Sequence, residues 1–279
     1  MSLAEKLQKA YGLGIWPEDP RTKEGYARYQ ASLNYFRKLL EHDWLGEMVR
    51  KKEITVLEIC AGAGIGGVAL ARSLMDKKCI VKLILTDVRE DVLRIGKKWG
   101  AEELGIDIEI SCTDAREIHR LGVKADIILM YGYSATHFDP WEMINLLASV
   151  SETLHDDGLF IINEIDRVYR IFYEVGFKRV LPEKITEDKL IISIHAGYDV
   201  LRGIFRRAYL DLKNPKNHVI LHNYYWNIAE LAALIWLFFN DVDFVPLMRN
   251  IMGFLLAKEP RRKIGPEDIR TLPRMIQQK

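Results

Sequence analysis

The chain has 279 residues, of which 49% are hydrophobic and 28% are charged, a composition typical of a globular protein with a sizeable core. Its 40 Lys and Arg residues nearly balance its 39 Asp and Glu residues, and the net charge of +1 gives no global field that would attract nucleic acid or an anionic membrane. The longest strongly apolar run, residues 231–239, is far shorter than the roughly 20 residues of a membrane span, so we expect a soluble protein without membrane contact.

Residues 1–53 are expected to form a helical cover, interrupted at residues 16–20 (WPEDP). Apolar side chains after this interruption recur at three- and four-residue steps, which places them on one stripe of a helix. They are Tyr26, Tyr29, Leu33, Phe36 and Leu40. Such a stripe is typical either of a helix packed on the core or of a cover over the mouth of a site.

Residues 54–165 alternate between apolar strands and helices and form the expected core. The predicted strands are residues 54–59, 82–86, 106–111, 126–130 and 159–163, and the predicted helices are residues 66–74, 91–104 and 141–154. Continuous apolar strands joined by helices indicate a parallel sheet that is covered on both faces. The fold class is therefore α/β with a doubly wound sheet.

Residues 166–222 break this alternation. Two strand-like runs, residues 190–195 and 203–212, joined by a turn-prone segment at 197–199, predict a helix and a hairpin inserted after the fifth strand. About fifty extra residues are unusual without a role, so we expect the insertion to cover the substrate. Its aromatic side chains would wall a pocket, or else form the insertion's own core or a dimer contact. They are Tyr169, Phe172, Tyr173, Tyr198, Phe205 and Tyr209.

Residues 223–259 are expected to close the sheet, and residues 260–279 to form a basic tail. A predicted helix at residues 226–240 is followed by two runs, 242–247 and 252–257, which are too close together for a crossover helix and must pair antiparallel. From residue 258 onward the chain has seven Lys and Arg against three Asp and Glu. Such a tail is typical of a solvated end, with an RNA or phosphate clamp as the alternative.

A glycine-rich turn follows the first predicted strand and opens a helix. Gly62, Gly64 and Gly67 satisfy G-x-G-x-x-G, and Asp87 lies 21 residues after Gly66, at the end of the second strand, where a carboxylate can hold ribose hydroxyls. Enzymes that bind nicotinamide dinucleotides and enzymes that bind S-adenosylmethionine share this geometry, so the glycines alone do not distinguish the two ligands.

Two further carboxylates discriminate between these ligands. Glu58 lies in the strand that leads into the turn, where it would repel a pyrophosphate and attract a ligand with an ammonium and a sulfonium. Asp114 follows the third strand, where it can accept from an adenine amino group while the N–H of Ala115 meets a ring nitrogen, although a helix N-cap is the alternative. Together with Asp87, these acids favour S-adenosylmethionine.

The chain resembles the class I S-adenosylmethionine-dependent methyltransferases over residues 54–165 and 223–259. Residues 56–64 (VLEICAGAG) are similar to the family's first motif, residues 85–88 (LTDV) to its ribose-binding motif and residues 113–115 (TDA) to its adenine-binding motif. The resemblance implies a Rossmann-like sheet, mostly parallel with an antiparallel last strand, and S-adenosylmethionine as the cofactor.

The resemblance also implies which residues bind this cofactor. Cys60 stands where the family usually has its first glycine, and the end of the fourth strand usually contacts the cofactor near its methionine part. The expected cofactor-binding residues are Glu58, Cys60, Ala61, Gly62, Gly64, Asp87, Val88, Asp114, Ala115, Met130 and Tyr131.

Methyl transfer from a sulfonium depends on positioning, and needs a base only when the acceptor must lose a proton early. The catalytic candidates, His137 and Tyr133, lie just beyond the fourth strand, beside Tyr131. His195, in the insertion, is a further candidate, and a structural role is the alternative for both histidines. No His/Cys/Asp cluster has metal-ligand spacing, so we expect no metal site.

The acceptor is expected to be a small molecule, because the chain lacks both an Asn/Asp-Pro-Pro-Tyr sequence after the fourth strand and any Pro-Cys pair. RNA is the second candidate acceptor, since residues 166–216 have eleven Lys and Arg against seven Asp and Glu. The glycine turn is also compatible with an NAD(P)-dependent oxidoreductase and with a non-catalytic S-adenosylmethionine-binding protein. The sequence is compatible with a homodimer. Three cysteines without a C-x-x-C pair indicate reduced thiols and a cytoplasmic location.

Overall fold

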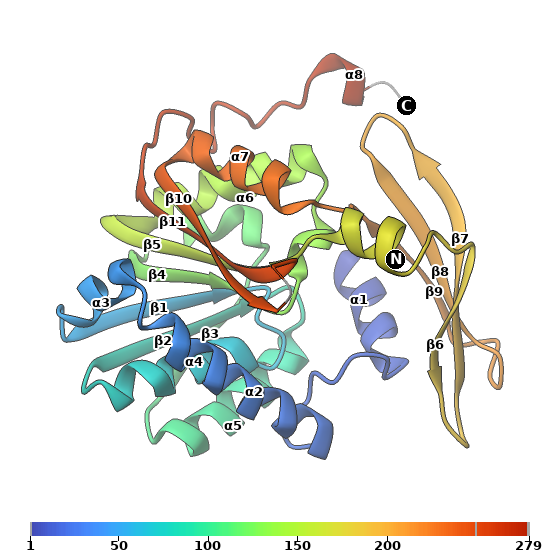
Figure 1. Ribbon diagram of the computed structural model, residues 1–279, viewed down its shortest axis with the longest axis horizontal. Coiled ribbons are helices and arrows are strands. Elements are labelled where there is room, and N and C mark those ends of the chain that lie inside the picture. Colours follow the sequence, from blue (N-terminus) through green and yellow to red (C-terminus); the bar gives the residue numbers. More distant parts are fainter. Residues whose placement is uncertain (1, 249, 278–279) are drawn as a thin grey trace.

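The computed structural model describes residues 2–248 and 250–277. Its central sheet has seven strands: β1 (Glu53–Ile59), β2 (Ile80–Asp87), β3 (Ile108–Cys112), β4 (Ala125–Met130), β5 (Leu154–Ile165), β10 (Phe239–Met248) and β11 (Met252–Pro260). Their order across the sheet is β10-β11-β5-β4-β1-β2-β3 (Figure 1). Strands β1 to β5 run parallel, whereas β11 pairs antiparallel with both β5 and β10. The mostly parallel sheet with a reversed last strand is thus confirmed.

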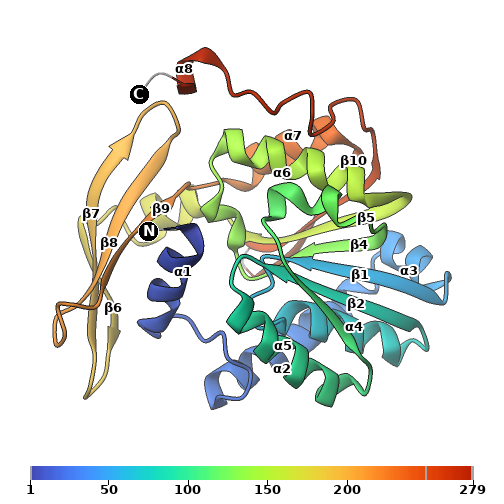
Figure 2. The same ribbon diagram turned by 180° about the vertical axis from the view of Figure 1, so that it is seen from behind.

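Helices cover both faces of this sheet, as Figure 2 shows. One face is covered by α2 (Lys23–Leu39), α4 (Ile65–Asp76) and α5 (Glu90–Leu104), and the other by the 3-10 helix η1 (Ala115–Leu121), α6 (Pro140–Thr153) and α7 (Ile228–Phe238). Successive strand residues point to opposite faces, so Val56 packs in the first of two apolar cores and Leu57 in the second. The remaining short helices are α3 (Asp43–Val49), η2 (Ser134–His137) and α8 (Arg274–Gln277).

The stripe predicted in the N-terminal region packs on the core. Tyr29 and Phe36 are fully buried beneath α2, and Phe36 contacts the ring of Phe254 from β11, with centroids 5.3 Å apart. Tyr26 is 47% exposed. Of the two interpretations open for this stripe, the structure therefore supports the packed helix over the cover of a site.

The insertion forms a second sheet, larger than the predicted hairpin. A short π-helix, η3 (Tyr169–Glu174), leads into four antiparallel strands in the order β6 (Val180–Ile185), β7 (Leu190–Asp199), β8 (Ile204–Asp211) and β9 (His218–Asn223). The predicted hairpin corresponds to β7 and β8, and β6 and β9 extend it on either side. This sheet stands beside the carboxyl ends of the main strands (Figure 1).

Helix α1 (Leu3–Gly12) lies between the two sheets (Figures 1 and 2). Leu7 and Ala10 of α1, together with Leu13 directly after it, form a third apolar cluster with the inner face of the second sheet, including Val219 and Leu221 of β9. Helix α1 and strand β9 therefore pack together, although more than 200 residues separate them in the sequence. No helix among residues 2–248 and 250–277 is long and apolar enough to span a lipid bilayer.

Candidate active site

A cavity of about 920 Å³ lies at the carboxyl ends of the main strands, between the main sheet, α1 and the second sheet. Most of the expected cofactor residues line it: Glu58, Cys60, Ala61, Gly62, Asp87, Val88, Asp114, Ala115 and Tyr131. Gly64 and Met130 do not line it. Met130 is the last residue of β4, and its side chain is fully buried in the core on the α6 face, whereas the next residue, Tyr131, reaches the cavity. The structure thus brings together residues from four separate strand ends.

The glycine-rich turn joins β1 to α4 by a backbone that only small residues tolerate. Gly62 and Gly64 have φ values of +54° and +73°, in the left-handed region that favours glycine. A Cβ on Gly64 would lie 2.6 Å from a methyl group of Leu85, so this glycine serves close packing of the helix on β2. Cys60 also has a positive φ, +54°, which explains why glycine is usual at this position and shows that the turn keeps its shape without it.

Glu58 is the most deeply buried carboxylate of the glycine turn, with 1% of its surface exposed. Its Oε2 accepts a hydrogen bond of 2.8 Å from the backbone N–H of Gly67, at the start of α4. Burial raises the pKa of Glu58 to about 8, against the opposing effects of this hydrogen bond and of Arg28. Among the described residues, no cationic group lies within ion-pair distance of Glu58. The carboxyl is therefore ready to interact with a cation in the cavity.

Asp87, at the end of β2, is linked to the N-terminal segment through Arg89. The Asp87 carboxylate accepts from the N–H of Gly62 at 2.8 Å and from the backbone N–H and Nε of Arg89 at 3.0 and 3.2 Å. Nη1 of Arg89 binds Glu18 at 3.0 Å, and its guanidinium lies 4.3 Å from the ring centroid of Tyr11. Because Asp87 and Glu18 both pair with Arg89, its positive charge is already compensated. Both of these acids line the cavity.

Asp114 caps the 3-10 helix η1, the second of the two roles that its sequence position allows. Its Oδ1 accepts from the backbone N–H of Arg116 at 2.9 Å, and its Oδ2 pairs with Nη2 of Arg116 at 2.6 Å. The hydrogen bonds from Arg116 hold the pKa of Asp114 below its usual value despite partial burial. Because Asp114 and Ala115 also line the cavity, the capping role and a ligand-binding role are compatible.

The electrostatic environment at this end of the cavity is negative. Burial, followed by the charges of Asp87, Asp114 and Glu58, raises the pKa of the Cys60 thiol well above its usual value. The thiol therefore stays neutral and is unsuited to act as a nucleophile. The same carboxylates would stabilise a bound cation.

Tyr131 and Tyr133 follow β4 and are tied into the surrounding structure. The Tyr131 hydroxyl lies 2.7 Å from Oγ of Ser32 on α2. The Tyr133 hydroxyl donates to the sulfur of Met252, and burial raises its pKa to about 12. A phenol with such a pKa keeps its proton at neutral pH. Tyr133 is therefore better suited to position an acceptor than to deprotonate it.

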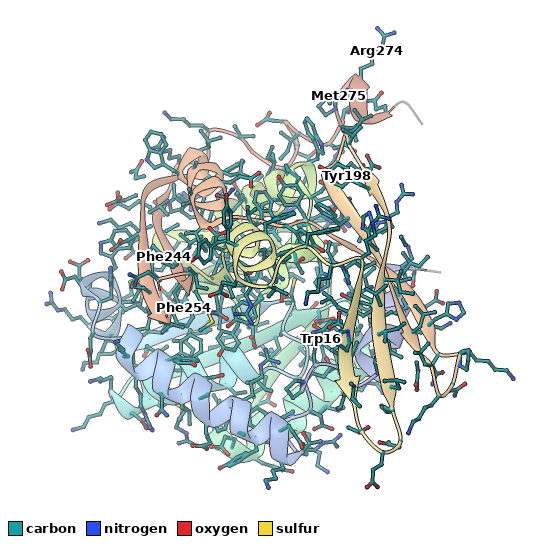
Figure 3. The ribbon with its side chains drawn as sticks, turned by 45° about the vertical axis from the view of Figure 1, so that its right-hand side comes forward. Trp16, Tyr198, Phe244, Phe254, Arg274 and Met275 are labelled. Atoms are coloured by element: carbon teal, nitrogen blue, oxygen red, sulfur yellow. The ribbon has the colours of Figure 1, made fainter. Side chains whose placement is uncertain are left out.

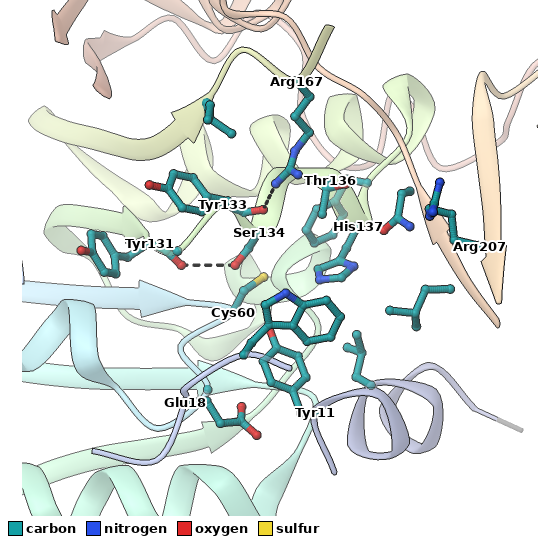
Figure 4. A pocket seen from close by; sticks show the side chains of 18 of the residues that line it. Tyr11, Glu18, Cys60, Tyr131, Tyr133, Ser134, Thr136, His137, Arg167 and Arg207 are labelled. Atoms are coloured by element: carbon teal, nitrogen blue, oxygen red, sulfur yellow. Dashed lines mark hydrogen bonds between the residues drawn. The ribbon is translucent and has the colours of Figure 1, made fainter. Parts of the chain in front are cut away.

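His137 projects into the cavity between Cys60 and Arg207 (Figure 4). Burial, reinforced by the charges of Arg167 and Arg89, lowers the pKa of His137 to about 4, so its ring is neutral at pH 7. Neither ring nitrogen has a hydrogen-bond partner within residues 2–248 and 250–277. His195, by contrast, does not line the cavity and packs against Phe177 in the second sheet.

Of the six aromatic residues predicted to wall the pocket from the insertion, only Tyr209 lines the cavity, whereas Phe177, which was not among them, also lines it. Tyr169, Phe172 and Tyr173 are between 43% and 77% exposed, because η3 is a single short helix that buries none of its residues. Tyr198 lies at the end of the second sheet nearest α8, far from the cavity residue Trp16 (Figure 3). Phe205 stacks on Tyr225, with ring centroids 4.4 Å apart, and does not reach the cavity.

Residues that the sequence analysis missed form the rest of the wall. They include Tyr11, Trp16 and Glu18 from the N-terminal segment and Arg167, Arg207 and Asn223 from the region after β5. The only sequence signal for the first group is the WPEDP interruption of the helical pattern. Nothing in the local sequence distinguishes Arg207 from other basic residues, because its role arises from the pairing of β8 in the second sheet.

No protein-family model matches the chain, and no curated protein sequence matches it. Several solved structures do. The PH0226 protein from Pyrococcus horikoshii OT3 matches with a TM-score of 0.62 and 17% identity, over 91% of this chain and 99% of that chain. The sugar N-methyltransferase KedS8 from Streptoalloteichus sp ATCC 53650 matches with a TM-score of 0.60 and 12% identity, over 94% and 95%. CalS10, an amino pentose methyltransferase from Micromonospora echinaspora solved with S-adenosylmethionine bound, matches with 0.51 and 14%, over 91% and 96%. The chain therefore has the fold of class I S-adenosylmethionine-dependent methyltransferases.

Proposed function

We propose that this protein is an S-adenosylmethionine-dependent methyltransferase whose acceptor is a small molecule bound in the cavity. The observation that carries the proposal is the buried carboxyl of Glu58, which lies beside the glycine turn and has no cationic partner among the residues described. A ligand that brings positive charge to this point favours the ionised form of the carboxyl and pairs with it, whereas the negative charge of a pyrophosphate opposes that ionisation.

The residues of the cavity fit S-adenosylmethionine. A carboxylate has about four acceptor sites. Asp87 and Asp114 each use three of them within the protein, and each retains capacity for one more donor. Asp87 would hold a ribose hydroxyl, Asp114 and the N–H of Ala115 the adenine, and Glu58 the ammonium of the methionine part. When bound, the cofactor supplies an electrophilic methyl group.

A nicotinamide dinucleotide fits the cavity less well. A pyrophosphate at the glycine turn would lie close to the Glu58 carboxyl. Arg89 is the nearest cation to the ribose site, but Asp87 and Glu18 already neutralise it at 3.2 and 3.0 Å. A 2′-phosphate would therefore find no uncompensated positive charge there.

His137 is the residue best suited to take a proton from the acceptor. Its ring is neutral at pH 7, faces the cavity and has a nitrogen lone pair available to an N–H or O–H group. Tyr133 lines the same cavity with a hydroxyl that keeps its proton. We infer that His137 serves as the general base and that Tyr133 helps to position the acceptor.

Enclosure of the cavity by α1 and the second sheet supports a small acceptor over RNA. The basic tail gives RNA little support, because several of its cations already have partners. Arg262 pairs with Asp156 at 2.5 Å, Arg270 with Glu267 at 2.5 Å, and Arg261 lies over the ring of Trp236. These contacts leave fewer free charges for phosphate groups.

Mass spectrometry of the purified protein tests this proposal. A methyltransferase of this kind is expected to retain S-adenosylmethionine or S-adenosylhomocysteine, at a level that falls in the Glu58→Gln variant. Retention of NAD or NADP in their place would contradict the proposal.

A further inference from the structure

The charges that line the cavity are separated between its two ends. Acidic side chains predominate at the glycine turn, whereas the end formed after β5 and by the second sheet is basic. The basic end has Arg167, Arg170, Lys178 and Arg207 against the single acid Glu183. Two carboxylates outside the lining, Glu164 and Glu174, pair with Arg167 and Arg170 at 3.3 and 3.1 Å. Even with these two included, the basic end keeps an excess of one positive charge.

Arg207 of β8 is the most deeply buried of these cations, with 5% of its surface exposed. Its guanidinium donates to neutral oxygens: to Oγ of Ser193 at 2.6 and 3.2 Å, to the carbonyl of Ser193 at 3.3 Å, to that of Lys178 at 3.5 Å, and to the side chain of Tyr225. No carboxylate of the described chain lies within 4.0 Å of it. The nearest acid along this network is Glu183, which accepts a hydrogen bond from the Ser193 hydroxyl.

A buried guanidinium without a direct counter-ion is unusual, because burying an unpaired charge is costly. Such a group is normally neutralised by a carboxylate or by a ligand. The Arg207 side chain points into the cavity from β8 (Figure 4), so an anion in the cavity can supply the missing charge.

Arg167 reaches the same space from the segment after β5. Its Nη2 donates to the carbonyl of Tyr133 at 2.8 Å, which places the guanidinium beside the backbone of one of the two catalytic candidates. Its Nε is buried and has no hydrogen-bond partner. His137 projects into the cavity between the glycine turn and Arg207 (Figure 4). An anion bound at Arg207 would thus leave the rest of its molecule close to His137, while Arg167 adds positive charge to the wall of the same cavity.

We propose that the methyl acceptor carries a carboxylate or phosphate group, and that Arg207, assisted by Arg167, binds this anion. The proposal rests on the proposed methyltransferase function and specifies the substrate class of the same site. Arg207 acts here as a specificity residue that holds the anionic group at the basic end of the cavity, so that the nucleophile of the acceptor faces the methyl donor and its proton lies within reach of His137.

Calorimetric titration of the protein saturated with S-adenosylhomocysteine tests the proposal. Inorganic phosphate is the probe in one arm and acetate in the other, with chloride keeping the ionic strength constant. The variants are Arg207→Met and, as a matched control, Arg206→Met. Arg206 is adjacent on β8, so its side chain points to the opposite face of the sheet, where it is 48% exposed.

Wild-type protein is expected to bind at least one probe saturably. Arg207→Met should weaken this binding at least tenfold, whereas Arg206→Met should change it less than twofold. Should Arg207→Met not fold, Arg207→Gln replaces it, with the same expected loss. Absence of saturable binding of either probe, or equal binding by all the variants, would overturn the proposal, and the arm that responds distinguishes a carboxylate from a phosphate.

The same experiment separates this proposal from the methyltransferase proposal. If S-adenosylhomocysteine binds and neither probe does, the anionic acceptor is wrong and the cofactor assignment stands. If a probe binds through Arg207 but S-adenosylhomocysteine does not, the anion site stands and the methyltransferase assignment is wrong.

Discussion

Raising the pH from about 5.5 to 7.0 should strengthen S-adenosylmethionine binding through Glu58. Burial raises the pKa of this carboxyl to about 8, so the ligand-free protein holds it in the neutral form over this range. A ligand with an ammonium and a sulfonium favours the ionised form, so a proton must leave when the ligand binds. Binding is therefore weakened in acid and gains strength as the pH approaches the pKa of Glu58.

The size of the effect follows from that pKa. Protonation of Glu58 in the ligand-free protein multiplies the dissociation constant by the factor 1 + 10^(pKa − pH), where the pKa is that of Glu58. With a pKa of about 8, the factor is about 300 at pH 5.5 and about 11 at pH 7.0, so affinity should rise roughly thirtyfold. An amino group with a pKa of about 7.7–8.0 stays mostly protonated in this range, and the ligand's own titration contributes little.

Isothermal titration calorimetry in two buffers of different ionisation enthalpy provides the assay. At pH 6.5 close to one proton should be released for each ligand bound. Glu58→Gln should bind more weakly and show a flat pH profile. His137 does not interfere, because its pKa of about 4 lies below the range tested. A flat profile for the wild-type protein, or an equal rise in Glu58→Gln, would refute the reasoning.

Three further predictions concern the ribose site, the base and the glycine turn. Asp87→Asn should weaken S-adenosylhomocysteine binding by about ten- to a hundredfold in calorimetry, because a hydrogen bond to a charged group contributes roughly 1.5–3 kcal/mol; an unchanged affinity would remove Asp87 from the site. His137→Gln should lower kcat by about 100-fold or more, as loss of a general base does, with S-adenosylhomocysteine affinity unchanged. The kcat of the wild-type protein should show no titration near pH 6.5, because protonation of His137 begins only near its pKa of about 4. Gly64→Ala should destabilise the protein more than Gly105→Ala in denaturant unfolding. Both glycines have a positive φ, in which an alanine costs about 1–2 kcal/mol. Only at position 64 does the new Cβ also clash with Leu85, which costs about 1–3 kcal/mol more. Equal losses would show that Leu85 moves aside freely.

The main sheet and the glycine-turn end of the cavity could be predicted because their signals are local. Apolar runs of strand length predict the parallel strands. The glycine turn and a carboxylate at each of three successive strand ends predict that Glu58, Asp87 and Asp114 meet. Met130 shows where such reasoning stops. One residue along a strand reverses the direction of a side chain, so an uncertainty of one residue in the strand end turns a cavity residue into a core residue.

The acceptor end of the cavity could not be predicted because it depends on long-range packing. Nothing near Leu7 indicates that α1 packs against β9, and this contact is what brings Tyr11 and Trp16 to the cavity. In the insertion, aromatic composition indicated a pocket wall, yet the register of the second sheet turned Arg207 inward and left Tyr198 exposed. Composition does not determine register.

The most direct test of the central claim is a thermal-unfolding measurement with S-adenosylhomocysteine, NAD and NADP, each at about 100 times its dissociation constant or, where no binding is detected, at millimolar concentration. A ligand at 100 times its dissociation constant stabilises the folded protein by about 2.7 kcal/mol. For a chain of this size that corresponds to a rise in melting temperature of roughly 5–10 °C. We predict this rise with S-adenosylhomocysteine and none with NAD or NADP. A rise with either dinucleotide and none with S-adenosylhomocysteine would contradict the account.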